Sequence, residues 1–205
     1  MNAPAATLPR ASTTHLLYLH GFRSSPHSMK ARIVAARVAQ AHPALVWWCP
    51  QLPPSPRKAM ASIDEGIAHW PKSSMAVIGS SLGGFYATQV AARTGCRAVL
   101  LNPAVDPARD LAAYIGEQTQ WHDPATRFVF RPEHIDELRA LEVGPLPDPA
   151  RCMAIVAKGD EVLDWREMVG RYPDSRIELL EGSDHALSDF EQRHLDRVMA
   201  FIDPV

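Results

Sequence analysis

One stretch of the sequence decides the fold: Met75-Ala76-Val77-Ile78-Gly79-Ser80-Ser81-Leu82-Gly83-Gly84. Its first four residues are apolar and typical of a buried strand, whereas residues 82–93 have the pattern of a helix. The G-x-S-x-G sequence between them is typical of a sharp strand-to-helix turn that holds a serine in a strained conformation and tolerates only small neighbours. Such a pentapeptide also occurs in ordinary glycine-rich turns, but its position favours Ser81 as a nucleophile and leaves Ser80 a packing role.

The rest of the chain alternates short apolar runs with longer segments of helical periodicity, as in parallel sheets with crossover helices. Besides the strand before Ser81, strands are predicted at residues 15–20, 45–49, 98–101, 152–156 and 176–180. Helices are predicted to begin at Ser25-Pro26, at Ser55-Pro56 (reaching about Trp70), at Leu82, and at Ser188, where Ser188 and Glu191 match a capping box. This order predicts an α/β-hydrolase fold with a mostly parallel sheet and helices on both faces.

The domain organisation follows from two departures from this alternation. Residues 104–150 are rich in proline and carry no strong strand signal, so we expect a small cap segment inserted over a site. Residues 1–14 are rich in Ala, Pro, Ser and Thr, which is typical of a flexible N-terminal tail. The remainder, residues 15–205, is the right size for a single domain.

Composition excludes several function classes. A formal net charge of −2 gives no broad attraction for nucleic acid, and the apolar runs are too short to span a bilayer. The three cysteines, Cys49, Cys96 and Cys152, form no C-x-x-C pair, which suits a reducing compartment. We therefore expect a cytoplasmic monomer or small homo-oligomer.

A serine nucleophile needs a general base that a carboxylate orients, and in this fold the chain order is nucleophile, acid, histidine. His185 lies in the loop between the last strand and the last helix, so we predict it as the base of Ser81. Asp160, directly after the strand at 152–156, is the preferred acid. Asp164 is the alternative, although it also suits a helix N-cap, and Glu161 is a third candidate.

The other predicted features of the site are hydrogen-bond donors and a substrate pocket. The backbone amides of Leu82 and Phe22 are expected to form an oxyanion hole. Phe85 and Tyr86 are candidate substrate-binding residues that would also fit a plain core. Arg23 is a further candidate, with a solvated loop position as the simpler alternative. No histidines pair at a metal-ligand spacing, and the predicted chemistry requires no cofactor.

Several blocks of the chain together resemble the YqiA-like bacterial esterases, which are small α/β-hydrolases. The blocks are Leu19-His20-Gly21-Phe22, Ser24-Ser25-Pro26, Gly79 to Gly84, Leu101-Asn102-Pro103-Ala104, Gly159 to Asp164, and Asp184-His185-Ala186. They occur in the family's order from residue 15 to the final helix. The resemblance implies an esterase of acyl esters, with acyl-CoA thioesters as a further substrate class, and Ser81, Asp160 and His185 as its triad. Arg23 replaces a common asparagine, which bears on substrate choice.

The sequence thus predicts a serine hydrolase that cleaves small carboxylic esters or thioesters through an acyl-enzyme. One alternative keeps the triad and transfers the acyl group to another acceptor or cleaves an amide. A second alternative is a hydrolase-fold protein that only binds a ligand. The presence of candidates for all three triad positions disfavours this second alternative.

Overall fold

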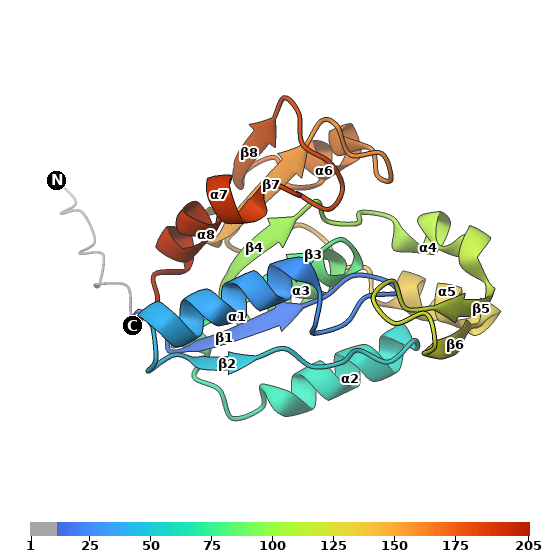
Figure 1. Cartoon of the computed structure of the whole chain (residues 1–205), viewed down its shortest axis with the longest axis horizontal. Coiled ribbons are helices and arrows are strands. Elements are labelled where there is room, and N and C mark those ends of the chain that lie inside the picture. The colour runs from blue at the N-terminus through green and yellow to red at the C-terminus, as the bar shows by residue number, and fades with distance from the viewer. Residues whose placement is uncertain (1–11) are drawn as a thin grey trace, which may run out of the picture.

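A computed structural model describes residues 12–205, which form a six-stranded sheet in the order β2-β1-β3-β4-β7-β8 (Figure 1). Each neighbouring pair of strands is parallel. The strands are β1 (His15–Leu19), β2 (Val46–Trp48), β3 (Met75–Ser80), β4 (Arg97–Leu101), β7 (Cys152–Ala157) and β8 (Arg176–Leu180). All six predicted strands are therefore confirmed, as is the parallel sheet.

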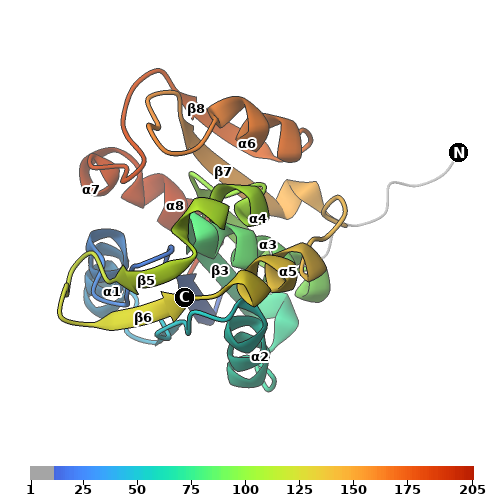
Figure 2. The same ribbon diagram turned by 90° about the vertical axis from the view of Figure 1, so that its right-hand side faces the viewer.

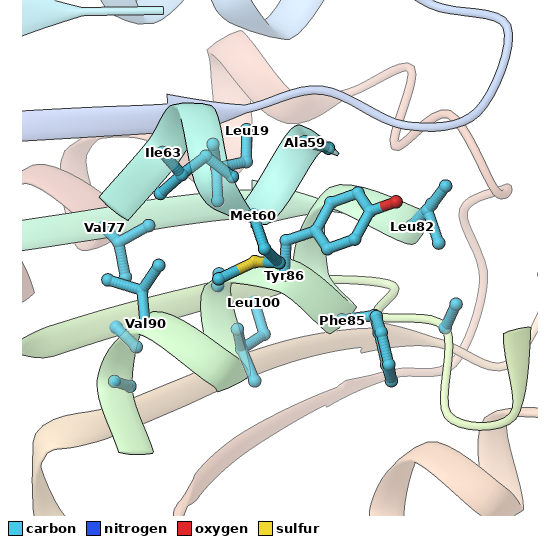
Figure 3. Close-up of a cluster of buried hydrophobic side chains, with 14 of the residues drawn as sticks. Leu19, Ala59, Met60, Ile63, Val77, Leu82, Phe85, Tyr86, Val90 and Leu100 are labelled. Carbon is cyan, nitrogen blue, oxygen red and sulfur yellow. The ribbon is translucent and has the colours of Figure 1, made fainter. Parts of the chain in front are cut away.

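Helices cover both faces of this sheet, which explains why its central strands are apolar at nearly every position. The helices are α1 (Met29–Ala41), α2 (Pro56–Gly66), α3 (Leu82–Thr94), α4 (Pro107–Asp110), α5 (Pro132–Ala140), α6 (Trp165–Arg171), α7 (Phe190–Arg193) and α8 (Leu195–Ile202). Residues of α1, α7 and α8 share one buried cluster with Leu16 and Tyr18 of β1. Residues of α2, α3 and α6 share the other cluster with Leu17 and Leu19, part of which Figure 3 shows.

Two predicted helix boundaries are wrong. α1 begins at Met29 and not at Ser25-Pro26, because the Ser25 hydroxyl accepts from the amide of His27 in a preceding turn. The predicted N-cap at Ser55 is confirmed, since its hydroxyl accepts from the Lys58 amide, but α2 ends at Gly66 and not near Trp70.

The predicted capping box of the last helix does not form. The amide and hydroxyl of Ser188 both donate to the carboxylate of Asp184 instead. The segment that follows is two short helices, α7 and α8, separated at His194.

Residues 104–150 contain a hairpin that the sequence did not predict. Its strands, β5 (Gly116–Thr119) and β6 (Arg127–Phe130), pair with each other in antiparallel fashion, away from the main sheet. Figure 2 looks onto this hairpin with α4 and α5, on the side where the parallel strands end. The strand signal is weak because only one side is buried, where the rings of Phe128 and Phe130 meet Phe22 edge-on.

The described part of the chain begins inside the predicted tail. Residues 1–11 lie outside the described residues, but Thr13 and Thr14 already belong to the domain. The Thr13 amide donates to the carbonyl of Asp203 at 2.7 Å, and the Thr14 amide to that of Ser74 at 2.8 Å. The predicted tail boundary at residue 14 is thus too late. Within residues 12–205, no helix combines the length and the apolar character that crossing a bilayer requires.

The packing of α3 against β1 requires glycine at Gly83. A Cβ there would lie 2.0 Å from the backbone oxygen of Leu19, which cannot rotate away as a side chain could. We expect Gly83→Ala to reduce the free energy of unfolding by about 3 kcal/mol, because the helix and strand must separate. Chemical denaturation would measure this loss.

Gly170 in α6 provides the control, because a Cβ there would have no heavy atom within 4 Å. Gly170→Ala should stabilise the protein by roughly 0.5–1 kcal/mol through its better helix propensity. Equal stability of the Gly83→Ala variant and the wild type would contradict the proposed backbone contact.

Candidate active site

Ser81 lies on the turn between β3 and α3, with φ 56° and ψ −122°. This conformation is strained for a residue with a side chain and persists only where the surroundings enforce it. Here the Ser81 amide donates to the Leu101 carbonyl at 3.0 Å, and the Ser81 carbonyl accepts from the amides of Gly84 and Ala104 at 2.8 and 3.1 Å. The backbone on both sides of the serine is therefore fixed by β4 and α3.

The structure brings Ser81, His185 and Asp160 into one hydrogen-bonded chain. The Oγ of Ser81 lies 3.0 Å from Nε2 of His185, and Nδ1 of the same ring lies 2.7 Å from Oδ2 of Asp160. The other carboxylate oxygen of Asp160 accepts from the amides of Val162 and Leu163, each at 2.8 Å. These bonds orient a carboxylate that is wholly buried, opposite a histidine side chain that is 21% exposed.

The other predicted acids lie elsewhere. Asp164 caps α6, where its Oδ1 accepts from the amide of Arg166 at 2.9 Å. Glu161 accepts from the backbone amide of His185 at 3.0 Å and so contacts the loop rather than the ring. Of the three candidates, Asp160 is thus the residue whose carboxylate reaches the imidazole.

The two amides predicted for the oxyanion hole have no acceptor within residues 12–205. Leu82 is the first residue of α3, so its amide points out of the positive end of a helix. Phe22 follows Gly21, whose Cα lies so near the serine that an added Cβ would be 3.2 Å from the Cβ of Ser81. Both amides are thus available beside Ser81.

His20 braces the loop that carries Phe22. Its buried ring has Nδ1 3.0 Å from the carbonyl of Gly21, and its Nε2 accepts from the amide of Leu52 at 3.1 Å. Burial lowers the pKa of His20, which favours the neutral ring that these two bonds require. The side chain of His20, directly after β1, therefore fixes this loop.

Arg23 is not a solvated loop residue. Its Nε donates to the carbonyl of Thr119 at 2.8 Å, and its guanidinium lies 4.1 Å from the ring centroid of Trp121. The amide of Trp121 in turn donates to the carbonyl of Arg23 at 2.8 Å. Arg23 therefore attaches the β5–β6 hairpin to the loop beside Ser81.

The two aromatic candidates are core residues, although Tyr86 also reaches a cavity. Phe85 and Tyr86 are both buried, with their ring centroids 5.8 Å apart. Tyr86 lines a cavity of about 220 Å³ together with Leu52 and Phe128, and burial raises the pKa of its hydroxyl. Figure 3 shows Tyr86 and Leu82 at the edge of the buried cluster.

Sequence reasoning gave Asn102 no role at the site, but the structure connects it to the His185 loop. Asn102 is fully buried at the end of β4, and its Nδ2 donates to the carbonyls of Asp184 and His185 at 3.0 and 3.2 Å. Its Oδ1 accepts from the amide of Ala157 in β7 at 2.8 Å. The sequence offered one signal for this role. Asn102 directly follows the predicted strand at 98–101, and the next predicted strand along the chain is the one that precedes Asp160.

Two further cavities open beside Ser81 and His185. One, of about 390 Å³, extends toward the start of α1, and the other, of about 620 Å³, extends toward α4. Trp121 of the hairpin segment lines both of them. No group of three or more His, Cys, Asp or Glu side chains within residues 12–205 is arranged to hold a metal ion.

A sequence model described as the uncharacterised protein family UPF0227 matches residues 15–203. The chain belongs to the UPF0227 family. A UPF0227 protein of Yersinia enterocolitica is 23% identical over 190 residues, which cover 91% of this chain and 97% of that protein. The YqiA-like resemblance identified from the sequence blocks is confirmed by this match.

Solved structures of other proteins have the same fold as this UPF0227 protein. The mouse α/β-hydrolase domain-containing protein 10 aligns with a TM-score of 0.69 at 16% identity, over 94% of this chain and 89% of the mouse chain. A structure described with LipS and LipT, two metagenome-derived lipolytic enzymes, aligns with a TM-score of 0.66 at 20% identity, over 95% and 98%. The predicted α/β-hydrolase fold is thus confirmed.

Asn102 offers a test of how the His185 loop is held. Asn102→Ala would leave the buried Ala157 amide and two carbonyls without their partner, and we expect a loss of roughly 2–4 kcal/mol in the free energy of unfolding. Any enzymatic turnover that depends on His185 should fall as well. Thermal or chemical denaturation measures the first effect.

Asn102→Gly separates the effect of the lost hydrogen bonds from the effect of backbone strain in this test. Asn102 has φ 42°, a conformation that glycine adopts freely and alanine does not. The glycine variant should therefore be the more stable of the two while still losing the same hydrogen bonds. If the alanine variant were as stable as the wild type, Asn102 would not be holding this loop.

Proposed function

We propose that this UPF0227 protein is a serine hydrolase that cleaves carboxylic esters or acyl thioesters. The observation that carries the proposal is the continuous chain from Ser81 Oγ through the His185 ring to Asp160, with contacts of 3.0 and 2.7 Å. A base within hydrogen-bond reach of the serine, itself oriented by a buried carboxylate, is what nucleophilic catalysis by serine requires.

The proposed reaction has two acyl-transfer steps. His185 removes the proton from Ser81 as the hydroxyl attacks the carbonyl carbon, and Asp160 stabilises the imidazolium that forms. The free amides of Phe22 and Leu82 bind the oxyanion, and the imidazolium then protonates the departing alcohol or thiol. Water, activated by the same imidazole, hydrolyses the acyl-enzyme and regenerates the serine.

Residues 104–150 are proposed to act as a cap over this site. Arg23 and Thr119 attach its hairpin to the oxyanion loop, and residues of α4 line the larger cavity beside Ser81. An ester as the substrate class is supported by the structural likeness to the lipolytic enzymes. A thioester, including acyl-CoA, is supported by the YqiA-like resemblance. Transfer to another acceptor or amide cleavage would use the same triad.

A fluorophosphonate probe tests the nucleophile directly, because it phosphonylates an activated serine. We expect the wild type to be labelled at Ser81 and the Ser81→Ala variant to be unreactive. Labelling would be measured by intact-protein mass spectrometry. Retention of the label in Ser81→Ala, or an unlabelled wild type, would refute the assignment.

The two neighbouring aspartates provide a matched pair for the acid. Asp160→Asn should lower kcat by about 10³–10⁴-fold, because it removes the carboxylate that orients the imidazole. Asp164→Asn keeps an oxygen that can accept from the Arg166 amide at the N-cap of α6, so it should change both stability and kcat little. Hydrolysis of p-nitrophenyl butyrate would report both effects, and similar rates for the two variants would contradict the choice of Asp160.

A further inference from the structure

We propose that Lys30 makes the cavity beside it a binding site for an anionic group of the substrate, a carboxylate or phosphate close to the scissile bond. This inference rests on the proposed hydrolase function and names its substrate class: an ester or thioester with an apolar group on one side of the scissile bond and a negatively charged group on the other.

Lys30 is a buried cation with unused hydrogen-bonding capacity. It lies in the first turn of α1, 9% exposed, and its ammonium donates to the carbonyl of Ala186, next to His185. Within residues 12–205 that carbonyl is its one acceptor, although an ammonium has three N–H donors. Burial lowers the pKa of Lys30 to about 8, with Asp184 and Asp160 opposing the shift. A buried lysine is normally paired, and an anion would complete its coordination.

The acidic residues near Lys30 already have other partners. Asp160 accepts from the His185 ring and from two backbone amides, and Asp184 accepts from the amide and hydroxyl of Ser188. Neither forms an ion pair with Lys30 within the described chain. The positive charge of Lys30 therefore remains available to a ligand.

The cavity of about 390 Å³ beside Lys30 has no carboxylate in its lining among the described residues. The residues that line it, all within 12–205, include Ser81 and His185 but no Asp or Glu. The Tyr18 hydroxyl, buried in its wall, has no hydrogen-bond partner among the described residues. The positive end of α1 opens here too, since Ser28 does not cap it and its first turn has no acidic residue. An anion in the cavity would find two kinds of favourable partner: the ammonium of Lys30 and the amides at the start of α1.

The cavity on the other side of Ser81 has the opposite character. The cavity of about 620 Å³ is lined by the carboxylates of Asp110 and Glu161 and by apolar side chains such as Leu111 and Leu163. Arg23 also lines it, but its guanidinium is already held by Thr119 and Trp121. Carboxylates repel an anionic substituent, whereas leucines accept an acyl or alkyl chain. Because both cavities meet at Ser81 and His185, a substrate spanning them carries its charge on the Lys30 side.

Two pairs of isosteric esters test this, with the charge on the acyl part in one pair and on the alcohol part in the other. The first pair is monoethyl succinate and ethyl succinamate, and the second is 4-carboxyphenyl butyrate and 4-carbamoylphenyl butyrate. We expect the wild type to prefer the anionic member of one pair by about tenfold or more in kcat/KM. Lys30→Met should reduce that preference by about tenfold, measured in a pH-stat at pH 7.

The preference ratio isolates the charge of Lys30 from its contact with Ala186. A shift of the His185 loop in Lys30→Met would slow both members of a pair alike and leave the ratio unchanged. Lys58→Met, which removes an exposed lysine of α2, is the control for overall charge and should keep the wild-type ratio. Absence of any anion preference in the wild type, or an equal preference in Lys30→Met, would overturn the proposal.

A binding measurement keeps this test separate from the proposed reaction. Calorimetry on the Ser81→Ala variant should detect the preferred anionic ester, and adding Lys30→Met should weaken its binding about tenfold. Fluorophosphonate labelling of the otherwise wild-type protein reports independently whether Ser81 is a nucleophile. If Ser81 is labelled but the protein shows no anion preference or binding, the anion site at Lys30 is refuted and the hydrolase function is not. If the anionic ester binds but Ser81 is not labelled, the hydrolase function is refuted and the anion site stands.

Discussion

The close contact of α3 with β1 is the constraint on which the active-site geometry depends. A Cβ at Gly83 would collide with the backbone oxygen of Leu19, and one at Gly79 would lie 2.2 Å from the Gly83 oxygen. With glycine at both positions the helix starts directly above the sheet, and the turn between them compresses Ser81 into its positive-φ conformation. The same approach points the first amide of α3 toward the place where an oxyanion would form.

The remaining groups gather there because parallel strands end at one edge of the sheet. Ser81 follows β3, Asp160 follows β7 and His185 follows β8, and β4 lies between the first two strands. Asn102 at the end of β4 fills this gap, since its amide joins β7 to the loop that carries His185. A buried side chain other than these three thus fixes the loop that carries His185.

The two sides of the site differ in charge because different elements form them. The start of α1 contributes Lys30 to one side. The segment from α4 and the loop after β7 contribute Asp110 and Glu161 to the other, where the guanidinium of Arg23 is already held by Thr119 and Trp121. Loops and helix ends at the strand termini vary freely without disturbing the sheet, which is how one fold accommodates many substrates.

The sequence by itself determined the strands, their mostly parallel direction, the strand-to-helix turn at Ser81 and the chain order of Ser81, Asp160 and His185, because these depend on local apolar runs and on position in the chain. It left Asp160 and Asp164 as alternatives, since both follow the same strand and lie only four positions apart. Only the tertiary structure decided which carboxylate meets the imidazole, that Arg23 anchors a hairpin, and that Asn102 and Lys30 contact the His185 loop. Those contacts join residues far apart in the chain, 55 to 156 positions for the bonds of Asn102 and Lys30, so no local pattern encodes them. The β5–β6 hairpin escaped prediction for the same reason: its buried side faces Phe22 of another segment rather than a partner within the main sheet.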